Sequence, residues 1–384
     1  MTGHEITPLR EGGRPPFAQV DFDQTPFIVF WEVTRACALA CLHCRATAQP
    51  RRHPEELTTQ EGFNLIDQLV DIGRPLLVIT GGDPMMRPDL YALIAYGNGK
   101  GLRVSLAPSA TKLVTRRALE RVKEAGVARL SLSLDGPDAE AHDAFRRTPG
   151  SYQRSMEILQ DARELGISLQ VNSTVSRYNV KVLDVLMERV AEFQPAVWSL
   201  FFLVPTGRGQ KEDMISPQEH EAVFRWLYHL SHRVPFDVKT TAAEHYRRVV
   251  IQMSRGDGAS EGPPGPEQVL VAPGFSFQDG IGRSAKGVND GRGCCFISHV
   301  GDVCPSGFLP LVGGSLRRQS LAEIYRHSPL FRDLRDVAKL KGKCGRCEYN
   351  QVCGGSRARA YAVTGDYLAA EPYCVYQPTE TRVA

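Results

Sequence analysis

Three cysteines lie within eight residues near the start of the chain, in the segment 33-VTRACALACLHCRA-46. Cys37, Cys41 and Cys44 have the spacing C-x3-C-x2-C, which offers three thiolates where a structural zinc site usually takes four ligands. Half of a zinc site, or a set of buried thiols, is one interpretation. The alternative is a [4Fe-4S] cluster, in which three thiolates leave one iron without a protein ligand and free to bind a substrate or a cofactor.

A second group of cysteines lies near the C-terminus. The sequence CGRCEYNQVC contributes Cys344, Cys347 and Cys353, and Cys374 follows after twenty intervening residues. A zinc ribbon explains the C-x2-C pair, whereas four thiolates in this order are also able to hold an iron–sulfur cluster. The segment 291–384 is therefore predicted to be a small domain held together by metal rather than by a large core.

Three more cysteines precede this group, at Cys294, Cys295 and Cys304. Neighbouring side chains diverge, so Cys294 and Cys295 cannot easily bind one metal together. Two or three of these thiolates would form an incomplete second auxiliary site with an open iron. Alternatively, all three are small buried residues, as Cys often is.

The elements that must position these residues follow from an alternation of β-rich runs with longer amphipathic runs. Each β-rich run is nearly continuous in apolar or β-branched residues, as strands buried on both faces are. The predicted strands are 27–33, 76–80, 102–107, 128–134, 168–175 and 197–203, and the predicted helices are 58–72, 88–98, 115–125, 151–165, 180–192 and 217–231. Six such units predict an α/β fold, an open partial (β/α)6 TIM-like barrel, followed by the small C-terminal iron–sulfur domain.

The domain boundaries follow from the same patterns. Residues 1–26 are expected to form a polar N-terminal arm, 27–232 the partial barrel, 233–290 a connecting region and 291–384 the cysteine-rich domain. Within the connecting region, 254–268 is rich in Gly, Pro, Ser and acidic residues and is predicted to be a flexible loop.

Unusual residues follow every predicted strand. The cysteine segment follows the first strand, and the later segments are 80-TGGDP-84, 107-APSAT-111, 135-DGPD-138, 176-SRYN-179 and 205-PTGRG-209. The carboxyl ends of parallel strands meet at one face, where such folds carry their chemistry. A single Gly-Gly-Asp-Pro segment is most often only a turn, so the shared edge is what indicates a site.

With cysteines at the first strand end and a Gly-Gly-acid segment at the second, the chain resembles the radical S-adenosylmethionine (SAM) superfamily over residues 27–205. The resemblance implies that Cys37, Cys41 and Cys44 are catalytic and hold a [4Fe-4S] cluster whose open iron binds SAM. It implies that the reduced cluster splits SAM to a 5′-deoxyadenosyl radical, which removes a hydrogen atom from the substrate. A flavodoxin or a ferredoxin is the implied electron donor.

The resemblance also implies contacts to SAM. The matching positions are Gly81, Gly82, Asp83, Ser109, Ser133, Asn172 and His43. Asp83 replaces the usual Glu of a segment that contacts the methionyl amine through its backbone, and Ser109 stands where Asn is usual. Ser133 and Asn172 match positions that often bind the carboxylate or the ribose, and His43 is expected to pack beside adenine.

At the C-terminus the resemblance extends to the SPASM or twitch domain. It implies that Cys344, Cys347, Cys353 and Cys374 hold an auxiliary [4Fe-4S] cluster. A full SPASM pattern continues with a cysteine four residues after the third of these, where this chain has Arg357. The missing thiol normally serves a second auxiliary cluster that lies nearer the active site.

The combined pattern most resembles the branch of heme-pathway enzymes that remove carboxyl groups from tetrapyrrole side chains. Such substrates need cationic partners, and Arg208 in a strand-end loop is the preferred candidate. His245 and His299 are candidate ligands of a tetrapyrrole iron, although a lone histidine more often has a structural role. The other arginines considered are Arg35, Arg45, Arg146, Arg147, Arg247 and Arg248.

Two other functions are consistent with parts of the pattern. Many SPASM proteins modify ribosomal peptides, but only about 26 residues precede the first strand here, fewer than a leader-binding domain needs. A non-catalytic iron–sulfur electron carrier would not need the Gly-Gly-acid loop. The peptide-modifying enzyme is therefore the main alternative.

Composition limits the partners and the compartment. Lys and Arg number 46 against 43 Asp and Glu, a balance that predicts neither a nucleic-acid partner nor a membrane surface. The N-terminus lacks the apolar core of a signal peptide, and no apolar run approaches the ~18 residues of a membrane span. Ten cysteines suit metal ligands in a reducing compartment, so the cytoplasm is the expected location.

Overall fold

A parallel sheet forms the centre of the protein in the computed structural model, which describes residues 20–255 and 287–378. Its first seven strands are parallel, and each of the first six pairs with the next along the chain. These strands are β1 (Ile28–Glu32), β2 (Leu76–Thr80), β3 (Val104–Leu106), β4 (Arg129–Ser133), β5 (Leu169–Val175), β6 (Val197–Phe202) and β7 (Asp237–Thr241).

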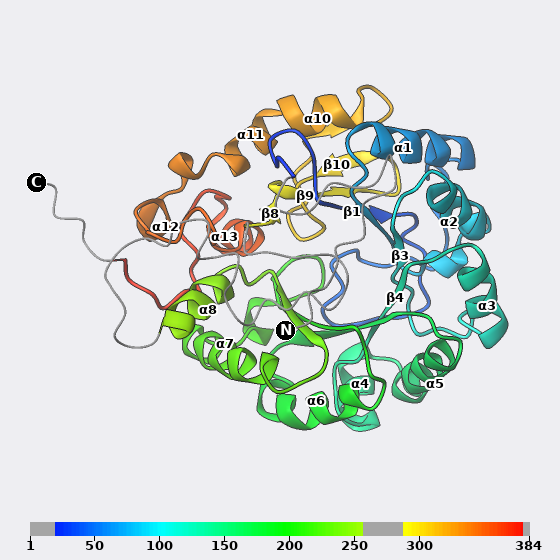
Figure 1. Ribbon diagram of the computed structural model, residues 1–384, viewed down its shortest axis with the longest axis horizontal. Helices are drawn as coiled ribbons and strands as arrows, with labels where there is room; N and C mark the ends of the chain where they lie inside the picture. The colour runs from blue at the N-terminus through cyan, green and yellow to red at the C-terminus, as the bar shows by residue number, and fades with distance from the viewer. Residues whose placement is uncertain (1–19, 256–286, 379–384) are drawn as a thin grey trace, which may run out of the picture.

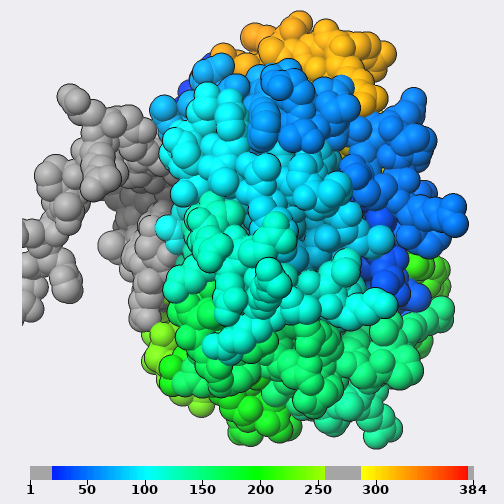
Figure 2. All heavy atoms as spheres, turned by 90° about the vertical axis from the view of Figure 1, so that its right-hand side faces the viewer, coloured from blue at the N-terminus to red at the C-terminus, as the bar shows by residue number. Residues whose placement is uncertain are grey.

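Helices cover the outside of this sheet and follow one another around it largely in chain order, except that α5 lies between α3 and α4 (Figure 1). They are α1 (Thr59–Asp71), α2 (Leu90–Gly99), α3 (Arg116–Glu124), α4 (Ala139–Arg146), α5 (Ser151–Glu164), α6 (Leu183–Ala191), α7 (Pro217–Ser231) and α8 (Tyr246–Arg255). Seen from the side of α1, α2 and α3, the surface belongs mainly to the first half of the chain (Figure 2). The predicted open, TIM-like α/β fold is confirmed.

The C-terminal residues continue the same sheet. Its strands there are β8 (Asn289–Asp290), β9 (Gly293–Ile297), β10 (Asp302–Cys304) and β11 (Gly314–Ser315), and the helices are α10 (Leu321–His327), α11 (Pro329–Arg335), α12 (Gly342–Gly345) and α13 (Arg357–Thr364). β9 pairs in parallel with β1, with Ile28 opposite Cys294. These elements occupy the arc between α1 and α8, so they flank the open side of the barrel (Figure 1).

The predicted elements agree closely with those observed, with three additions in the barrel. All six predicted strands and all six predicted helices overlap observed ones. The connecting region 233–290, however, contains β7 and α8, and α4 was not predicted. The sequence of β7, DVKTT, has only one large apolar residue because its polar side chains face the barrel interior. Of the predicted loop 254–268, residues 256–268 lie outside the described residues.

The predicted capping box of α1 is present. Glu61 N donates to Thr58 Oγ1 at 3.2 Å, and Thr58 N donates to Glu61 Oε2 at 2.7 Å. The core beneath the helices includes Trp31 and Trp198, both fully buried. None of the helices in the described part of the chain has the length and apolar character needed to cross a bilayer.

Candidate functional site

The loop after β1 carries Cys37, Cys41 and Cys44, and all three line one cavity inside the barrel. Burial raises the pKa of the Cys37 thiol, which disfavours the thiolate that a metal ligand requires. For Cys37 a hydrogen-bond donor acts in the other direction, because Leu39 N donates to its Sγ at 3.3 Å. Arg146 Nη1 donates to Cys41 Sγ at 3.7 Å. The donor set therefore suits thiolates bound to metal.

Two glycines let neighbouring loops approach the cysteine loop. A Cβ at Gly82 would lie 2.4 Å from Ala36 O, and a Cβ at Gly207 would lie 2.5 Å from Cys44 O. Gly207 also has a φ of +60°, which favours glycine. Gly82 N donates to Thr34 O at 2.7 Å. The loops after β2 and β6 thus hold the cysteine loop from two sides.

A buried carboxylate at the end of β1 anchors the same loop. Glu32 is fully buried and lies 3.1 Å from Arg35 Nε, 3.0 Å from Arg45 Nη1 and 3.1 Å from His299 Nδ1. Burial alone would raise the pKa of Glu32, but Arg45, His299 and Arg35 together lower it to about 2. No sequence motif marked this residue. His299 faces Glu32 and is absent from the cavity wall, so the structure does not support it as a ligand of a tetrapyrrole iron.

Replacing Glu32 with glutamine is expected to lower the free energy of unfolding by about 3 kcal/mol, because it leaves the guanidinium of Arg45 without its counter-charge. In the wild type, ionised Glu32 contributes to the free energy of unfolding at pH values above the ordinary carboxyl pKa, and this contribution is lost as the pH falls toward about 2. Glu32→Gln should lack this pH dependence. Urea unfolding of the anaerobic holoprotein measures both. Glu164→Gln, at an exposed ion pair with Arg116, is the control and should leave the urea midpoint nearly unchanged, because exposed ion pairs contribute little to stability. Equal midpoints for the two variants would contradict the anchoring role.

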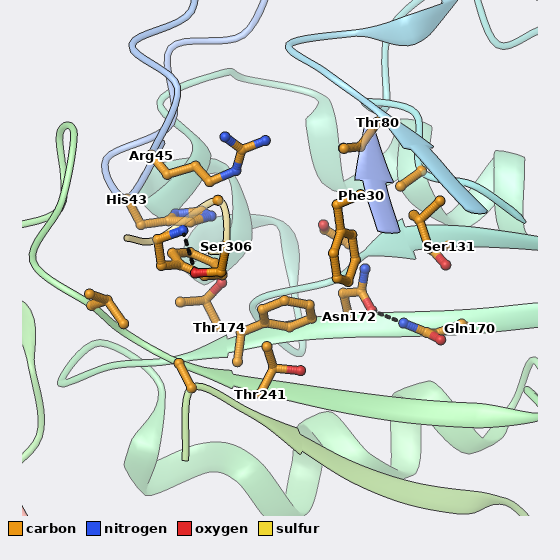
Figure 3. A pocket seen from close by; sticks show the side chains of 18 of the residues that line it. Phe30, His43, Arg45, Thr80, Ser131, Gln170, Asn172, Thr174, Thr241 and Ser306 are labelled. Carbon is orange, nitrogen blue, oxygen red and sulfur yellow. Dashed lines mark hydrogen bonds between the residues drawn. The ribbon is translucent and has the colours of Figure 1, made fainter. Parts of the chain in front are cut away.

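The cavity has a volume of about 460 Å³, within the range of small-molecule sites. Figure 3 shows side chains from several strands, among them Phe30, Ser131 and Thr241, directed into one space with His43 and Arg45 of the cysteine loop. The predicted site residues in its wall are Cys37, Cys41, His43, Cys44, Gly81, Gly82, Ser109, Ser133, Asn172, Arg208 and Cys294. The three cysteines and the predicted residues at the strand ends thus line the same cavity inside the barrel.

Asp83 is the predicted SAM-binding residue whose side chain lies behind this wall. It is fully buried, accepts from Thr111 Oγ1 at 2.7 Å and from Met85 N at 3.1 Å, and its pKa is raised by burial. Its side chain therefore joins the loops after β2 and β3. Ser109 extends this joint, since its hydroxyl donates to Gly82 O at 2.8 Å and contacts Cys37 Sγ at 3.5 Å.

Ser133 and Asn172 lie opposite each other on the paired strands β4 and β5. The Nε2 of Gln170 donates to Asn172 Oδ1 at 2.8 Å, so the amide nitrogen of Asn172 is left to donate into the cavity (Figure 3). Binding of the SAM carboxylate or ribose by this pair stays a prediction.

His43 is stacked on Phe145, with ring centroids 4.3 Å apart and an angle of 7° between the planes. Burial, reinforced by the nearby Arg146, lowers its pKa to about 3, so the ring is neutral. Its position in the cavity wall suits packing against a flat ring, while its contact with adenine stays a prediction.

Most of the candidate arginines already have partners. Arg35 and Arg45 pair with Glu32, Arg146 Nε donates to Asp135 at 2.7 Å, and Arg248 pairs with Glu221. Arg208 braces the cysteine loop, because its Nε donates to Cys41 O at 2.8 Å. Its Nη2, however, is buried without a partner among the described residues, which leaves a donor for an anionic ligand.

Two buried carboxyl groups in the cavity were missed by the sequence analysis. Burial raises the pKa of Glu244, and the charge of Asp290 raises it further; the pKa of Asp290 is also raised, mainly by burial. Glu244 Oε2 has no partner among the described residues. The pair lies in segments without a recognisable motif, so only the fold brings it into the cavity.

A second, smaller pocket is lined by Cys344, Cys347, Cys353 and Cys374. Glu371 N donates to Cys344 Sγ at 3.3 Å and Gly355 N donates to Cys353 Sγ at 3.4 Å. Tetrahedral zinc, with Zn–S bonds of about 2.3 Å, would require the sulfurs to converge on one point. Within residues 20–255 and 287–378, no three His, Cys, Asp or Glu side chains are grouped to hold a single metal ion.

Cys294 and Cys295 face opposite sides of β9, whereas Cys304, on the paired strand β10, lies near Cys295, whose pKa is raised by burial and by the charge of Cys304. Cys294 lines the main cavity, whereas Cys295, next along β9, is fully buried in the hydrophobic core on the other face. Arg357, where SPASM domains have a cysteine, is buried and donates to the carbonyl oxygens of Tyr367 and Ala369 at 3.1 and 2.7 Å. The side chain of Arg357 is thus hydrogen-bonded to the backbone at the position where a second auxiliary cluster would need a thiolate.

Comparison with known proteins gives independent information on both regions. Residues 31–186 match the radical SAM superfamily, and residues 289–348 match the iron–sulfur cluster-binding SPASM domain. An AdoMet-dependent heme synthase of Nitratidesulfovibrio vulgaris is 43% identical over 360 residues, covering 93% of this chain and 94% of that protein. One from Methanosarcina barkeri is 41% identical over 353 residues, covering 92% and 97%. The crystal structure of Streptococcus suis SuiB bound to its precursor peptide SuiA has the same fold, with a TM-score of 0.67, 15% identity and coverage of 92% and 76%.

Proposed function

The chain belongs to the radical SAM superfamily and carries a SPASM domain, and from this premise we propose that it modifies the side chains of a tetrapyrrole in heme biosynthesis. It is an iron–sulfur enzyme that uses SAM. The observation that carries the proposal is the cavity, in which three cysteines at the strand ends face an interior lined by aromatic and cationic side chains.

The residues present fit the two cofactors. Cys37, Cys41 and Cys44 would hold the first cluster, and Gly81 and Gly82 lie beside them in the wall where SAM is expected. When bound, the cluster and SAM supply an electron and a 5′-deoxyadenosyl radical. The cysteine loop, held by the loops after β2 and β6, fixes where that radical meets the substrate.

The interior of the cavity suits a flat macrocycle with carboxylate arms. Phe30, Phe201 and Phe308 supply aromatic surface. The unpartnered Nη2 of Arg208 is a donor for a carboxylate. With its raised pKa, Glu244 is able to stay protonated and donate to a second arm rather than repel it.

The chemistry of such a substrate defines the reaction. A propionate arm that gives up a hydrogen atom from the carbon next to the ring, then one electron, loses its carboxylate as CO2 and becomes a vinyl group. The hydrogen atom would go to the 5′-deoxyadenosyl radical that SAM supplies when bound, and the electron needs an acceptor. We propose that Cys344, Cys347, Cys353 and Cys374 would hold a cluster able to take up this electron. We also propose that the electron donor is a flavodoxin or a ferredoxin, and that the protein acts in the cytoplasm without nucleic acid.

The proposal is tested by an anaerobic assay of 5′-deoxyadenosine production across candidate substrates. Reconstituted protein with SAM and dithionite is expected to form deoxyadenosine in proportion to product only with an iron porphyrin that carries propionate arms. A peptide substrate is the second candidate, since the fold is shared with an enzyme solved with a precursor peptide. Product formation from peptides but from none of the porphyrins would overturn the tetrapyrrole assignment.

A further inference from the structure

The segment 242–248 separates the two cavities of the protein. Glu244 and Arg247 line the large cavity inside the barrel, whereas His245 and Arg248 line the pocket of the four C-terminal cysteines. Side chains of one short segment therefore reach both the proposed substrate site and the proposed electron acceptor.

His245 has an unsatisfied hydrogen-bonding capacity in this wall. It is 1% exposed, and both of its ring nitrogens are buried without a partner among the described residues. An imidazole carries at least one N–H in either protonation state. Leaving a buried donor unsatisfied costs about 1–3 kcal/mol, so an acceptor is expected beside the ring.

The protein neighbours of His245 do not supply that acceptor. Its ring lies 5.7 Å from that of His220 and meets Phe224 edge-on at 4.7 Å. The carboxylate of Glu371, in the same pocket wall, accepts from Ser356 N at 2.9 Å and from Arg359 Nη1 at 3.3 Å. The remaining acceptors in the wall of the pocket include the sulfurs of the four cysteines. Neither ring nitrogen of His245 bonds to any described residue, and this includes Tyr349, Asn350 and Tyr376 in the same wall.

Cations around the pocket indicate the charge of what it holds. Lys343 and Arg248 lie in its wall, where Lys343 donates to Cys374 O and Arg248 is paired with Glu221. A cubane cluster with four thiolates is anionic, so it would be stabilised there and would present sulfur atoms to the N–H of His245. Hydrogen bonds to cluster sulfurs favour the more negative, reduced state and so raise the reduction potential.

We infer that His245 donates a hydrogen bond to a sulfur of the auxiliary cluster and thereby raises the reduction potential of that cluster. His245 is a positioning residue in this account, because it acts on the electron acceptor and does not touch the substrate. The inference rests on the proposed ligation by Cys344, Cys347, Cys353 and Cys374, but its test needs no substrate.

The test is a redox titration of the reconstituted protein, followed by the electron paramagnetic resonance signal of the auxiliary cluster. His245→Phe, which keeps a ring but removes the donor, is expected to lower the midpoint potential, while iron content and SAM cleavage at the first cluster stay unchanged. His245→Asn keeps an N–H donor and should retain more of the wild-type potential.

His220→Phe is the matched control. His220 is equally buried and stacks on His245, but its Nδ1 faces Ser216 O at 2.9 Å and it does not line the cysteine pocket. A midpoint in His245→Phe equal to that of wild type, or a shift that His220→Phe reproduces, overturns the inference. If His245→Phe loses the auxiliary iron, the midpoint potential of His245→Asn is the deciding measurement. Because His245→Asn retains an N–H donor, a midpoint potential well below that of wild type would contradict the donor role.

Discussion

The substitution Cys41→Ser is expected to abolish reductive cleavage of SAM. Cys41 lies in the cavity wall between Cys37 and Cys44, and Arg146 donates to its sulfur. With only two thiolates left, the first cluster should not assemble, and iron should fall from about eight to about four per chain, because each cubane holds four. Deoxyadenosine formed with SAM and dithionite, together with iron content, measures the effect.

The control for this variant is another cysteine of the same chain. Cys295 is fully buried in the core and faces away from the cavity. Cys295→Ala should keep about eight irons and its cleavage activity, since no cluster is expected to use it. Cleavage that persists in Cys41→Ser, with a folded protein, would refute the assignment of the first cluster.

Replacing Cys374 with serine should separate SAM cleavage from product formation. Cys374 lies in the second pocket, so its loss should remove the auxiliary cluster and about four irons while leaving the first cluster intact. Without an electron acceptor, the substrate radical has no route to the vinyl product. Deoxyadenosine is therefore expected to form, while the yield of vinyl product falls at least about tenfold.

This second prediction has two contrary outcomes. Full product formation by Cys374→Ser would show that the electron leaves by another route. Wild-type iron near twelve per chain, rather than about eight, would show that Cys294, Cys295 and Cys304 hold a third cluster, although Cys294 and Cys295 face opposite sides of β9. Iron analysis of wild type and variant, prepared in parallel, distinguishes these outcomes.

Much of the barrel was predictable because its strands are buried on both faces. A run such as LLVIT in β2 is apolar along its whole length, and the helices between strands carry caps such as Thr58 with Glu61. The same reasoning missed β7. Its polar side chains line a cavity instead of a core, so the apolar signal that marks the other strands is absent.

The site was predictable where chemistry is concentrated in short motifs. Cys37, Cys41 and Cys44 share a loop, and the Gly-Gly-Asp segment follows the next strand. Glu32 and Glu244 were missed, because their importance depends on burial and on partners distant in the sequence. His245 was considered as a ligand of a substrate iron, but it lines the cysteine pocket and not the main cavity.

The most direct test of radical chemistry on a tetrapyrrole is whether a substrate hydrogen is transferred to SAM-derived deoxyadenosine. An iron porphyrin carrying deuterium on the propionate carbons next to the ring is incubated anaerobically with reconstituted protein, SAM and a reductant, and the products are analysed by mass spectrometry. One deuterium is expected in the deoxyadenosine for each propionate that is converted to vinyl with loss of CO2. Vinyl product accompanied by unlabelled deoxyadenosine, or labelled porphyrin recovered unchanged while a peptide is converted, would contradict this expectation.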